Sequence, residues 1–521
     1  MKVINQKDAV QLIKSNSTLA VSGFAGVSVP ESLLKELEKR FIREEKPKDI
    51  TLMFAAGQGE GKEKGLNHLA HEGLIKRVIG AHYNLAPKIG QMIINNKIEA
   101  YNFPQGVICN MFRDIARKSG FTISRVGVGT FVDPRYEGGK ANDMTKEDLV
   151  KLIDINGKKN LIFNNENINA AFIKGTYSDK NGNISMEHEA TYSEAFTIAQ
   201  AVRNCGGIVI VQVDEIIKNG KIQCDKVKIP GIYVDYVIEV RDDLENEQIL
   251  GLGYDGNLCG KIKENDGHSI SYSKKKIDVM KENNILNPRN IIGKRAFTEI
   301  AKGDVINIGI GIPEEVSKEV ERNKFNDFIT LTVEPGAIGG VPQSGMRFGS
   351  SYDPECIIDQ VSQFDFYDGG GLNISFLGMA ECDKSGNINV SRFGSKIPGC
   401  GGFIDITQNS KKCVFCGTFT AGGLEISVKD GKMKILKEGI NKKFVHDVNQ
   451  ITFNGRLATE NDEDIIYVTE RAVFKLFRDG LHIIEIAPGI DLENDILDLM
   501  EFKPVIDRNI SVMDEYCFFN D

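Results

Sequence analysis

The chain contains no tryptophan and only seven histidines among its 521 residues. It also lacks an uninterrupted apolar stretch near the ~20 residues that a membrane-spanning helix needs. The N-terminal residues lack the long apolar core of a secretory signal peptide. Ten cysteines are too few in so long a chain for a dense disulfide framework. From these absences we expect a protein without a membrane partner, located in the reducing cytoplasm.

The charge balance points away from nucleic acid as a partner. Formal net charge is −9, with 26% charged and 41% hydrophobic residues, as in ordinary soluble proteins. The length suggests two or more domains. The 53 glycines gather at the ends of apolar runs, which is typical of α/β enzymes with tight turns beside their strands.

Apolar runs alternate with helical patterns along the chain. Residues 18–21 and 49–54 read as strands, and a helix is expected to begin near Pro30. This alternation predicts βαβ units and a largely parallel sheet. The second half repeats the plan, with matching strands at residues 303–308 and 328–333.

Two later landmarks also occur in both halves. The turn of residues 179–184 matches that of residues 383–388, and the strand of residues 207–211 matches that of residues 412–416. Four landmarks in the same order indicate a duplicated domain. We therefore predict an α/β fold of two similar domains. Their expected boundaries are residues 1–241 and 286–521, with a polar linker over residues 242–285.

Glu334 is the most informative residue. It follows the apolar run of residues 329–333, and Pro335 and Gly336 form a turn directly after it. A carboxylate at such a strand end is a nucleophile, a general base, a metal ligand or an ordinary salt-bridged surface residue. Aligning Ile50 with Ile329 puts Ala55 opposite Glu334, so the fold itself does not need an acid there.

Gln105 is the second candidate, in a turn after another short apolar run. A neutral amide could donate to a developing oxyanion, although the spacing alone favours an ordinary turn residue. Residues 56–63 fail the phosphate-loop pattern, and residues 126–129 lack the third glycine of a dinucleotide fingerprint. The glycines of residues 399–402 and 417–423 could let a ligand approach the main chain, although each segment taken alone is more typical of a plain turn.

No metal site is predicted. His68 and His71 match neither of the zinc-helix patterns. Cys413 and Cys416 have redox-motif spacing, but they lie in an apolar run and read as buried strand residues.

Taken together, these segments resemble a family I CoA-transferase, closest to the acetate or propionate CoA-transferase group. The resemblance spans nearly the whole chain and is carried by residues 101–106, 126–135, 334–342, 364–371, 387–394 and 484–491. It implies an active site between two fused domains. It assigns the catalytic role to Glu334 and oxyanion or substrate binding to Gln105, Gly401 and Gly402. It also implies CoA-contacting loops at Gly23, Phe24, Gly26, Gly336, Gly370 and Gly371.

The activity implied by the resemblance is transfer of CoA between a short-chain acyl-CoA and a free short-chain acid. The route is ping-pong, through a glutamyl–CoA thioester. It needs no cofactor beyond CoA as substrate, and its partners are the two small molecules and further copies of the chain in a homo-oligomer. Pro335 departs from the Ser-Glu-Asn-Gly motif of the ketoacid branch, which favours simple acids. Two alternatives stay open: a thioesterase that uses water as acceptor, and a non-catalytic CoA sensor.

Overall fold

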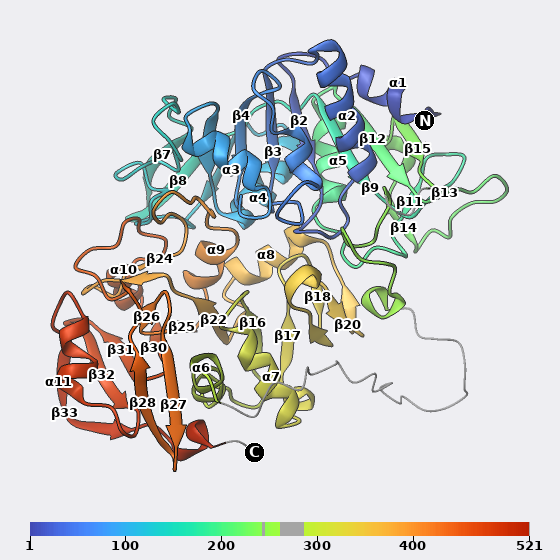
Figure 1. Ribbon diagram of the computed structural model, residues 1–521. Helices are drawn as coiled ribbons and strands as arrows, with labels where there is room; N and C mark the ends of the chain where they lie inside the picture. The colour runs from blue at the N-terminus through green and yellow to red at the C-terminus, as the bar shows by residue number, and fades with distance from the viewer. Residues whose placement is uncertain (242–244, 261–285, 520–521) are drawn as a thin grey trace, which may run out of the picture.

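The computed structural model describes residues 1–241, 245–260 and 286–519, and two large sheets dominate it (Figure 1). All neighbours in the first sheet are parallel. Its spatial order is β1 (Lys2–Val3), β15 (Tyr236–Glu239), β12 (Ile208–Val213), β9 (Ala170–Lys174), β2 (Thr18–Val21), β3 (Ile50–Phe54), β4 (Ile75–Gly80) and β5 (Glu99–Asn102).

The second sheet is mixed. Its five central strands are parallel, and antiparallel strands flank them on both sides. The spatial order is β21 (Cys356–Ile357), β18 (Ala337–Ile338), β17 (Thr330–Thr332), β16 (Val305–Ile308), β22 (Ile374–Gly378), β25 (Lys412–Cys416), β30 (Asp464–Val468), β31 (Ala472–Phe477), β32 (Gly480–Ile486) and β33 (Val505–Val512).

The two sheets share one plan, which confirms the predicted duplicated α/β fold. The order β15-β12-β9-β2-β3 in the first sheet corresponds to β30-β25-β22-β16-β17 in the second. The matching hairpins are β10 (Tyr177–Ser178) with β11 (Ile184–Ser185), and β23 (Glu381–Cys382) with β24 (Ile388–Asn389). In each turn an aspartate, Asp179 or Asp383, accepts from the backbone amides two and four residues further on.

Helices form three layers around the sheets (Figure 1). One outer layer is α1 (Gln6–Gln11), α2 (Glu31–Glu44) and α3 (Pro87–Ile94), and the other is α6 (Pro288–Phe297) and α7 (Glu314–Arg322). Between the sheets lie α4 (Gln105–Ala116), α5 (Ala195–Asn204), α8 (Gln360–Asp368) and α9 (Phe403–Thr407). Their apolar side chains form one continuous core from both halves, so the halves are packed together as one body.

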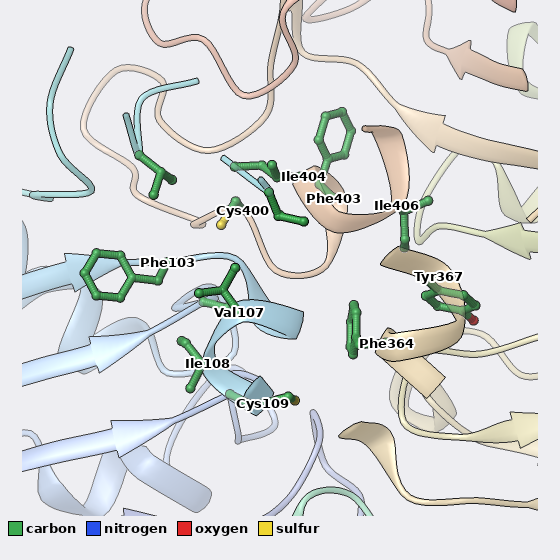
Figure 2. Packing of buried hydrophobic residues seen from close by; sticks show 14 of the residues in the cluster. Phe103, Val107, Ile108, Cys109, Phe364, Tyr367, Cys400, Phe403, Ile404 and Ile406 are labelled. Carbon is green, nitrogen blue, oxygen red and sulfur yellow. The ribbon is translucent and has the colours of Figure 1, made fainter. Parts of the chain in front are cut away.

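The middle layer follows from sequence periodicity. The buried residues of α4 include Val107, Ile108, Met111, Phe112 and Ile115, at the three-to-four spacing of a helix face. Figure 2 shows this helix, labelled at Val107 and Ile108, between the strands of the first sheet and the helices α8 and α9 that carry Phe364 and Ile404. Burial of this face against the other half fixes where the first turn of α4 lies.

Smaller elements complete the described chain. The remaining strands are β6 (Phe121–Ser124), β7 (Val150–Ile155), β8 (Lys158–Asn164), β13 (Glu215–Ile216), β14 (Val227–Ile229), β19 (Val341–Pro342), β20 (Ser351–Tyr352), β26 (Thr420–Ala421), β27 (Glu425–Lys429), β28 (Lys432–Lys437) and β29 (Asn441–Lys442). The short helices are α10 (Gly455–Glu460) and α11 (Leu492–Asp495), with 3-10 turns at Gly65–Leu69, Gly231–Tyr233, Gly256–Cys259, Asn326–Phe328, Gly345–Arg347, Leu497–Leu499 and Glu515–Phe518.

The predicted linker of residues 242–285 lies largely outside the described residues. Its described part, residues 245–260, packs on both halves. Leu250 is buried in the outer core of the first half, and the Tyr352 hydroxyl donates to Asp255 at 2.9 Å. Within the described ranges, no helix combines the length and apolar character needed to cross a membrane.

Candidate active site

Glu334 lies on a tight turn just after strand β17. The Gly336 amide closes this turn by donating to the Val333 carbonyl at 3.0 Å. Gly336 has a φ of +113°, and a Cβ there would overlap the Ile358 carbonyl. Only glycine fits such a position, so the turn holds Glu334 in one direction at the carboxyl end of a parallel strand. Ligands of open α/β sheets bind at this end.

The Glu334 carboxyl group is unpaired within the described part of the chain. Among the residues that the structure describes, no donor or cation pairs with it, and burial is the cause that raises its pKa to about 7. The residue as a whole is only half-buried, so the enclosed carboxyl group still has access from outside. An acid without a partner fits a reactive group better than a structural ion pair.

A glycine-rich segment, residues 399–402, borders this carboxyl group. A Cβ built on Gly402 would lie 3.3 Å from Glu334 Cδ, so the missing side chain leaves space beside the acid. Gly402 directly precedes helix α9. Within the described chain its amide donates no hydrogen bond, and it is therefore one of the free N–H groups at a helix start.

Gln105 reaches the same place from the other half. It is the first residue of α4 and is 2% exposed. Its backbone amide donates to the Gly401 carbonyl at 3.0 Å. Its side-chain Nε2 is buried without a hydrogen-bond partner in the described ranges. Leaving a buried donor unpaired costs free energy, so Nε2 is available to a bound molecule. The structure thus gathers Glu334, Gln105, Gly401 and Gly402 at the interface of the halves.

The sequence analysis did not single out two further acids nearby. Burial, and then the charge of Asp368, raises the pKa of Asp405 in α9 well above its ordinary range. Burial, and then the charge of Asp365, raises the pKa of Asp368 to about 7. The charge of Glu334 also acts on Asp405. Both acids lie on helices far from Glu334 in sequence, and no local motif marks them.

The loop of Gly23, Phe24 and Gly26 lies on the C-terminal half. The rings of Phe24 and Phe348 are 5.7 Å apart, and the Gly26 carbonyl accepts from Leu250 at 2.8 Å. A contact of this loop with CoA stays a prediction.

Gly370 and Gly371 directly follow helix α8. Their amides donate to the Tyr367 and Phe366 carbonyls at 2.9 Å, which ends the helix. No described hydrogen bond links them to Glu334 or Gln105. Their expected contact with CoA also stays a prediction.

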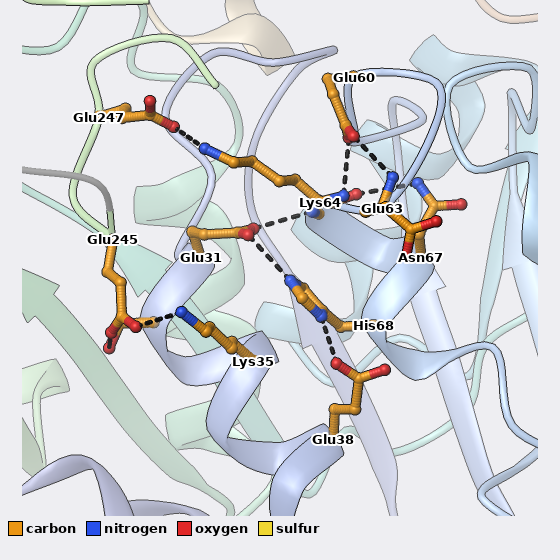
Figure 3. A network of polar contacts seen from close by, with 12 residues as sticks. Glu31, Lys35, Glu38, Glu60, Glu63, Lys64, Asn67, His68, Glu245 and Glu247 are labelled. Atoms are coloured by element: carbon orange, nitrogen blue, oxygen red, sulfur yellow. Dashed lines mark hydrogen bonds and ion pairs between the residues drawn. The ribbon is translucent and has the colours of Figure 1, made fainter. Parts of the chain in front are cut away.

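His68 and His71 belong to an ion-pair network, and Figure 3 shows the part around His68. His68 contacts Glu31 at 2.9 Å and Glu38 at 2.5 Å, and His71 contacts Glu38 at 2.8 Å. Burial alone would lower the pKa of His68, but its two glutamate partners raise it to about 9. A protonated histidine is not a metal ligand, and the described residues hold no group of three metal-binding side chains.

Comparison with known proteins decides the family. A family model described as coenzyme A transferase matches residues 3–240. The caffeate CoA-transferase of Acetobacterium woodii is 41% identical over 99% of this chain and 97% of that protein. The chain belongs to the coenzyme A transferase family. The acetate CoA-transferase YdiF of Escherichia coli (strain K12) is 40% identical, over 99% of this chain and 95% of that one.

A solved structure of a family member supports the same assignment across the fold. The acyl-CoA transferase YdiF of E. coli O157:H7, in a thioester complex with CoA, matches with a TM-score of 0.92 and 39% identity. The match covers 99% of this chain and 96% of that one. This coenzyme A transferase is therefore an enzyme that moves CoA between an acyl-CoA and an acid. The thioesterase alternative is not favoured.

Proposed function

We propose that Glu334 is the nucleophile of this transferase and carries CoA as a glutamyl thioester. One observation carries the proposal: the Glu334 carboxyl group has no partner among the described residues, and it lies beside the open surface of Gly402. Gln105 reaches this glycine segment from the opposite half with a free amide donor. A relative with the same fold has been solved as a thioester complex with CoA, which supports the same type of intermediate here.

The proposed reaction has two halves. The Glu334 carboxylate attacks the acyl-CoA carbonyl, which forms a mixed anhydride and releases CoA thiolate. The thiolate then attacks the glutamyl carbonyl, forms the glutamyl–CoA thioester and releases the first acid as its carboxylate. The acceptor carboxylate reverses both steps: it attacks the thioester, and CoA thiolate then takes the new acyl group. Each step exchanges one activated acyl bond, a thioester or an anhydride, for another. The reaction therefore needs no ATP or metal.

Each step passes through a tetrahedral oxyanion that needs donors. Two candidates have no hydrogen-bond partner in the described chain: the amide of Gly402, which borders the acid, and Nε2 of Gln105, whose backbone binds the adjacent Gly401. One such donor in a water-poor site contributes ~3 kcal/mol to transition-state stabilisation. Glutamate suits the position because its extra methylene lets the carbonyl carbon reach first an acyl group and then CoA.

The test is to isolate the intermediate. Incubation with acetyl-CoA and no acceptor acid should add CoA less one water to the peptide that contains Glu334, as measured by mass spectrometry. Glu334→Ala should abolish the adduct and nearly all turnover, and Glu334→Asp should lose most turnover. Glu463→Gln is the matched control, because burial also raises the pKa of Glu463 to about 7. Normal turnover in Glu334→Ala would refute the proposal.

We further propose short-chain acids as substrates, with acetate, propionate and butyrate as the first candidates. These differ by single methylenes, each worth only ~1 kcal/mol in a pocket. Because one relative is named for caffeate, an aromatic acid belongs in the acceptor panel. CoA release that is independent of any added acid would instead indicate a thioesterase, and binding without adduct or turnover a sensor.

Assembly, location and cofactor needs complete the proposal. We expect a homo-oligomer in the cytoplasm, with no cofactor other than CoA as substrate. Light scattering of the purified protein tests the oligomer. Full activity after exhaustive chelation is expected, and restoration of a lost activity by added metal would contradict the absence of a cofactor.

A further inference from the structure

Each half sends a short arm across the interface. In both halves the arm is the segment just before the helix at the interface: residues 191–194 before α5, and residues 398–402 before α9. The Gln105 amide, at the start of α4, donates to Gly401 O at 3.0 Å. Correspondingly, the Gln360 amide, at the start of α8, donates to Ser193 O at 2.9 Å. The arms are therefore a paired feature of the duplicated fold.

The two arms differ in what they reach. The second arm supplies Gly401 and Gly402 beside the Glu334 carboxyl group. The first arm, residues 191–194, reaches the Glu334 turn itself. Thr191 Oγ1 donates to the carbonyl oxygen of Pro335 at 2.9 Å, and both groups are buried. Pro335 is the residue directly after Glu334, so this bond holds the Pro335–Gly336 peptide, the next peptide of the Glu334 turn.

The direction of this hydrogen bond is determined by its neighbours. The Ser193 amide, which can only donate, lies 2.9 Å from Thr191 Oγ1. The hydroxyl therefore accepts from Ser193 and gives its own proton to Pro335 O, which can only accept. Ser193 has a φ of +46°, in a region that non-glycine residues rarely adopt. Such a conformation persists only where surrounding contacts hold it.

The contacts close into a ring. The Thr191 hydroxyl donates to the Pro335 carbonyl, and the carbonyl of the next residue, Gly336, accepts from the Ile358 amide at 2.9 Å. Two residues after Ile358, the Gln360 amide donates to the Ser193 carbonyl, which closes the ring. The base of the arm is fixed as well. Ser28 Oγ donates to the Thr191 carbonyl at 2.9 Å. Two residues before Thr191, the fully buried Glu189 forms an ion pair with Lys174. A ring of this kind resists displacement of any member, including the Glu334 turn.

We propose that Thr191 is a positioning residue for Glu334, which it holds from the opposite half through the Pro335 carbonyl. The inference rests on the proposed nucleophilic role of Glu334. The physical reason is geometric: the Glu334 carbonyl carbon must meet the acyl carbon and then the CoA sulfur at near-attack distance. A misplacement on the order of 1 Å costs about 100-fold in rate. Substrate binding, which involves most of the CoA molecule, should be little affected.

The test compares three threonine variants of the full chain. Thr191→Val keeps the shape and removes the hydroxyl, so kcat and the rate of adduct formation on Glu334 should fall about 10- to 100-fold, with KM for acyl-CoA within about threefold. Thr191→Ser keeps the hydroxyl and should restore kcat to within about threefold of wild type. Thr145→Val is the control. It removes a buried hydroxyl that accepts from the Ala100 amide and has Asn142 Oδ1 at 2.7 Å and Ala100 O at 3.2 Å as acceptors, with no described hydrogen bond to either arm.

The outcomes separate the two proposals. If Glu334 is not the nucleophile, wild type itself forms no adduct, whatever Thr191 does. If wild type forms the adduct and Thr191→Val forms it at the same rate, the positioning role is overturned. An equal fall of kcat in Thr145→Val would also overturn it, because loss of any buried hydroxyl would then suffice. If Thr191→Val does not fold, Ser28→Ala is the second variant. It removes the hydrogen bond from Ser28 Oγ to the Thr191 carbonyl and so weakens the hold on the same arm. An unchanged kcat in that variant would count against the proposal, and a three- to tenfold fall would support it.

Discussion

Replacing Gln105 by methionine should separate activity from stability. Methionine keeps the length of the side chain and removes the amide. In the free enzyme Nε2 has no hydrogen-bond partner among the described residues, so the substitution breaks no bond and leaves no new group unpaired. The free energy of unfolding should therefore stay equal or rise slightly. In the transition state the lost donor costs ~3 kcal/mol, or on the order of 100-fold in kcat.

The duplicated fold supplies a matched control. Gln360 is the first residue of α8 and is fully buried, as Gln105 is the first residue of α4. Its Nε2 donates to Cys109 Sγ at 3.3 Å. Its Oε1 is buried without a partner in the described residues, so Gln360→Met removes one weak bond and one unpaired acceptor. Stability should change by less than ~1 kcal/mol, and kcat should stay within about threefold.

Acyl-CoA turnover with saturating acceptor acid gives kcat, and urea denaturation gives the free energy of unfolding. The reasoning is refuted if Gln105→Met keeps kcat within about threefold of wild type. It is equally refuted if both methionine variants lose activity in parallel.

Three further predictions concern the acids and the glycine at the interface. Because only ionised Glu334 attacks, kcat/KM should fall tenfold per pH unit below its pKa of about 7; a flat profile between pH 5.5 and 8.5 contradicts this. Gly402→Ala should lower kcat about 100-fold, because its Cβ would lie 3.3 Å from Glu334 Cδ and 3.0 Å from the Phe364 ring. Gly120→Ala is the control and should leave kcat unchanged, because the space around Gly120 is open. Burial raises the pKa of Glu194 from 4.5 to about 8, so the folded state keeps a proton that the unfolded state releases. The protonated Glu194 therefore contributes up to about 5 kcal/mol to the free energy of unfolding. This contribution is fully present below pH 4.5 and is lost as the pH rises to about 8. Glu194→Gln should remove that part of the pH dependence in urea denaturation, and an identical pH dependence in both proteins would show that Glu194 is ionised when folded.

The sequence was most informative where structure is local. Strand β2 coincides with the predicted residues 18–21, because an apolar run ended by Ser22 and Gly23 is sufficient to define it. The hairpin turns at Asp179 and Asp383 were equally visible, since each is closed by bonds within four residues. Glu334 and Gln105 were identified as candidates for the same reason, as polar residues directly after short apolar runs.

Contacts between distant segments were not predictable in this way. Thr191 reads as an ordinary polar residue before a helix, and its bond to Pro335 spans 144 positions. Asp405 reads as a solvent-facing helix residue, yet it is fully buried between the halves. Both depend on how the two copies of the domain pack, and a single sequence carries no local signal for that packing.

The duplication also explains why only one half provides an accessible acid. In the C-terminal half the acid, Glu334, follows the strand, and glycine, Gly402, precedes the helix. In the N-terminal half the arrangement is exchanged: Ala55 follows the strand, and Glu194 precedes helix α5. The Ala55 main chain lies near the Glu194 carboxyl group, although neither oxygen makes a hydrogen bond of ordinary geometry in the described structure. Each half therefore retains one acid near the corresponding place.

Their surroundings give these two acids different chemistry. Glu194 is 0% exposed and its pKa is raised to about 8, so at neutral pH it is protonated and closed off from a thioester. Glu334 is half-buried, and with a pKa of about 7 it is substantially ionised under the same conditions. A glutamate at the helix start thus places the acid inside the interface, and a glutamate at the strand end places it at the accessible edge. A nucleophile that must receive both an acyl group and CoA is possible only at that edge.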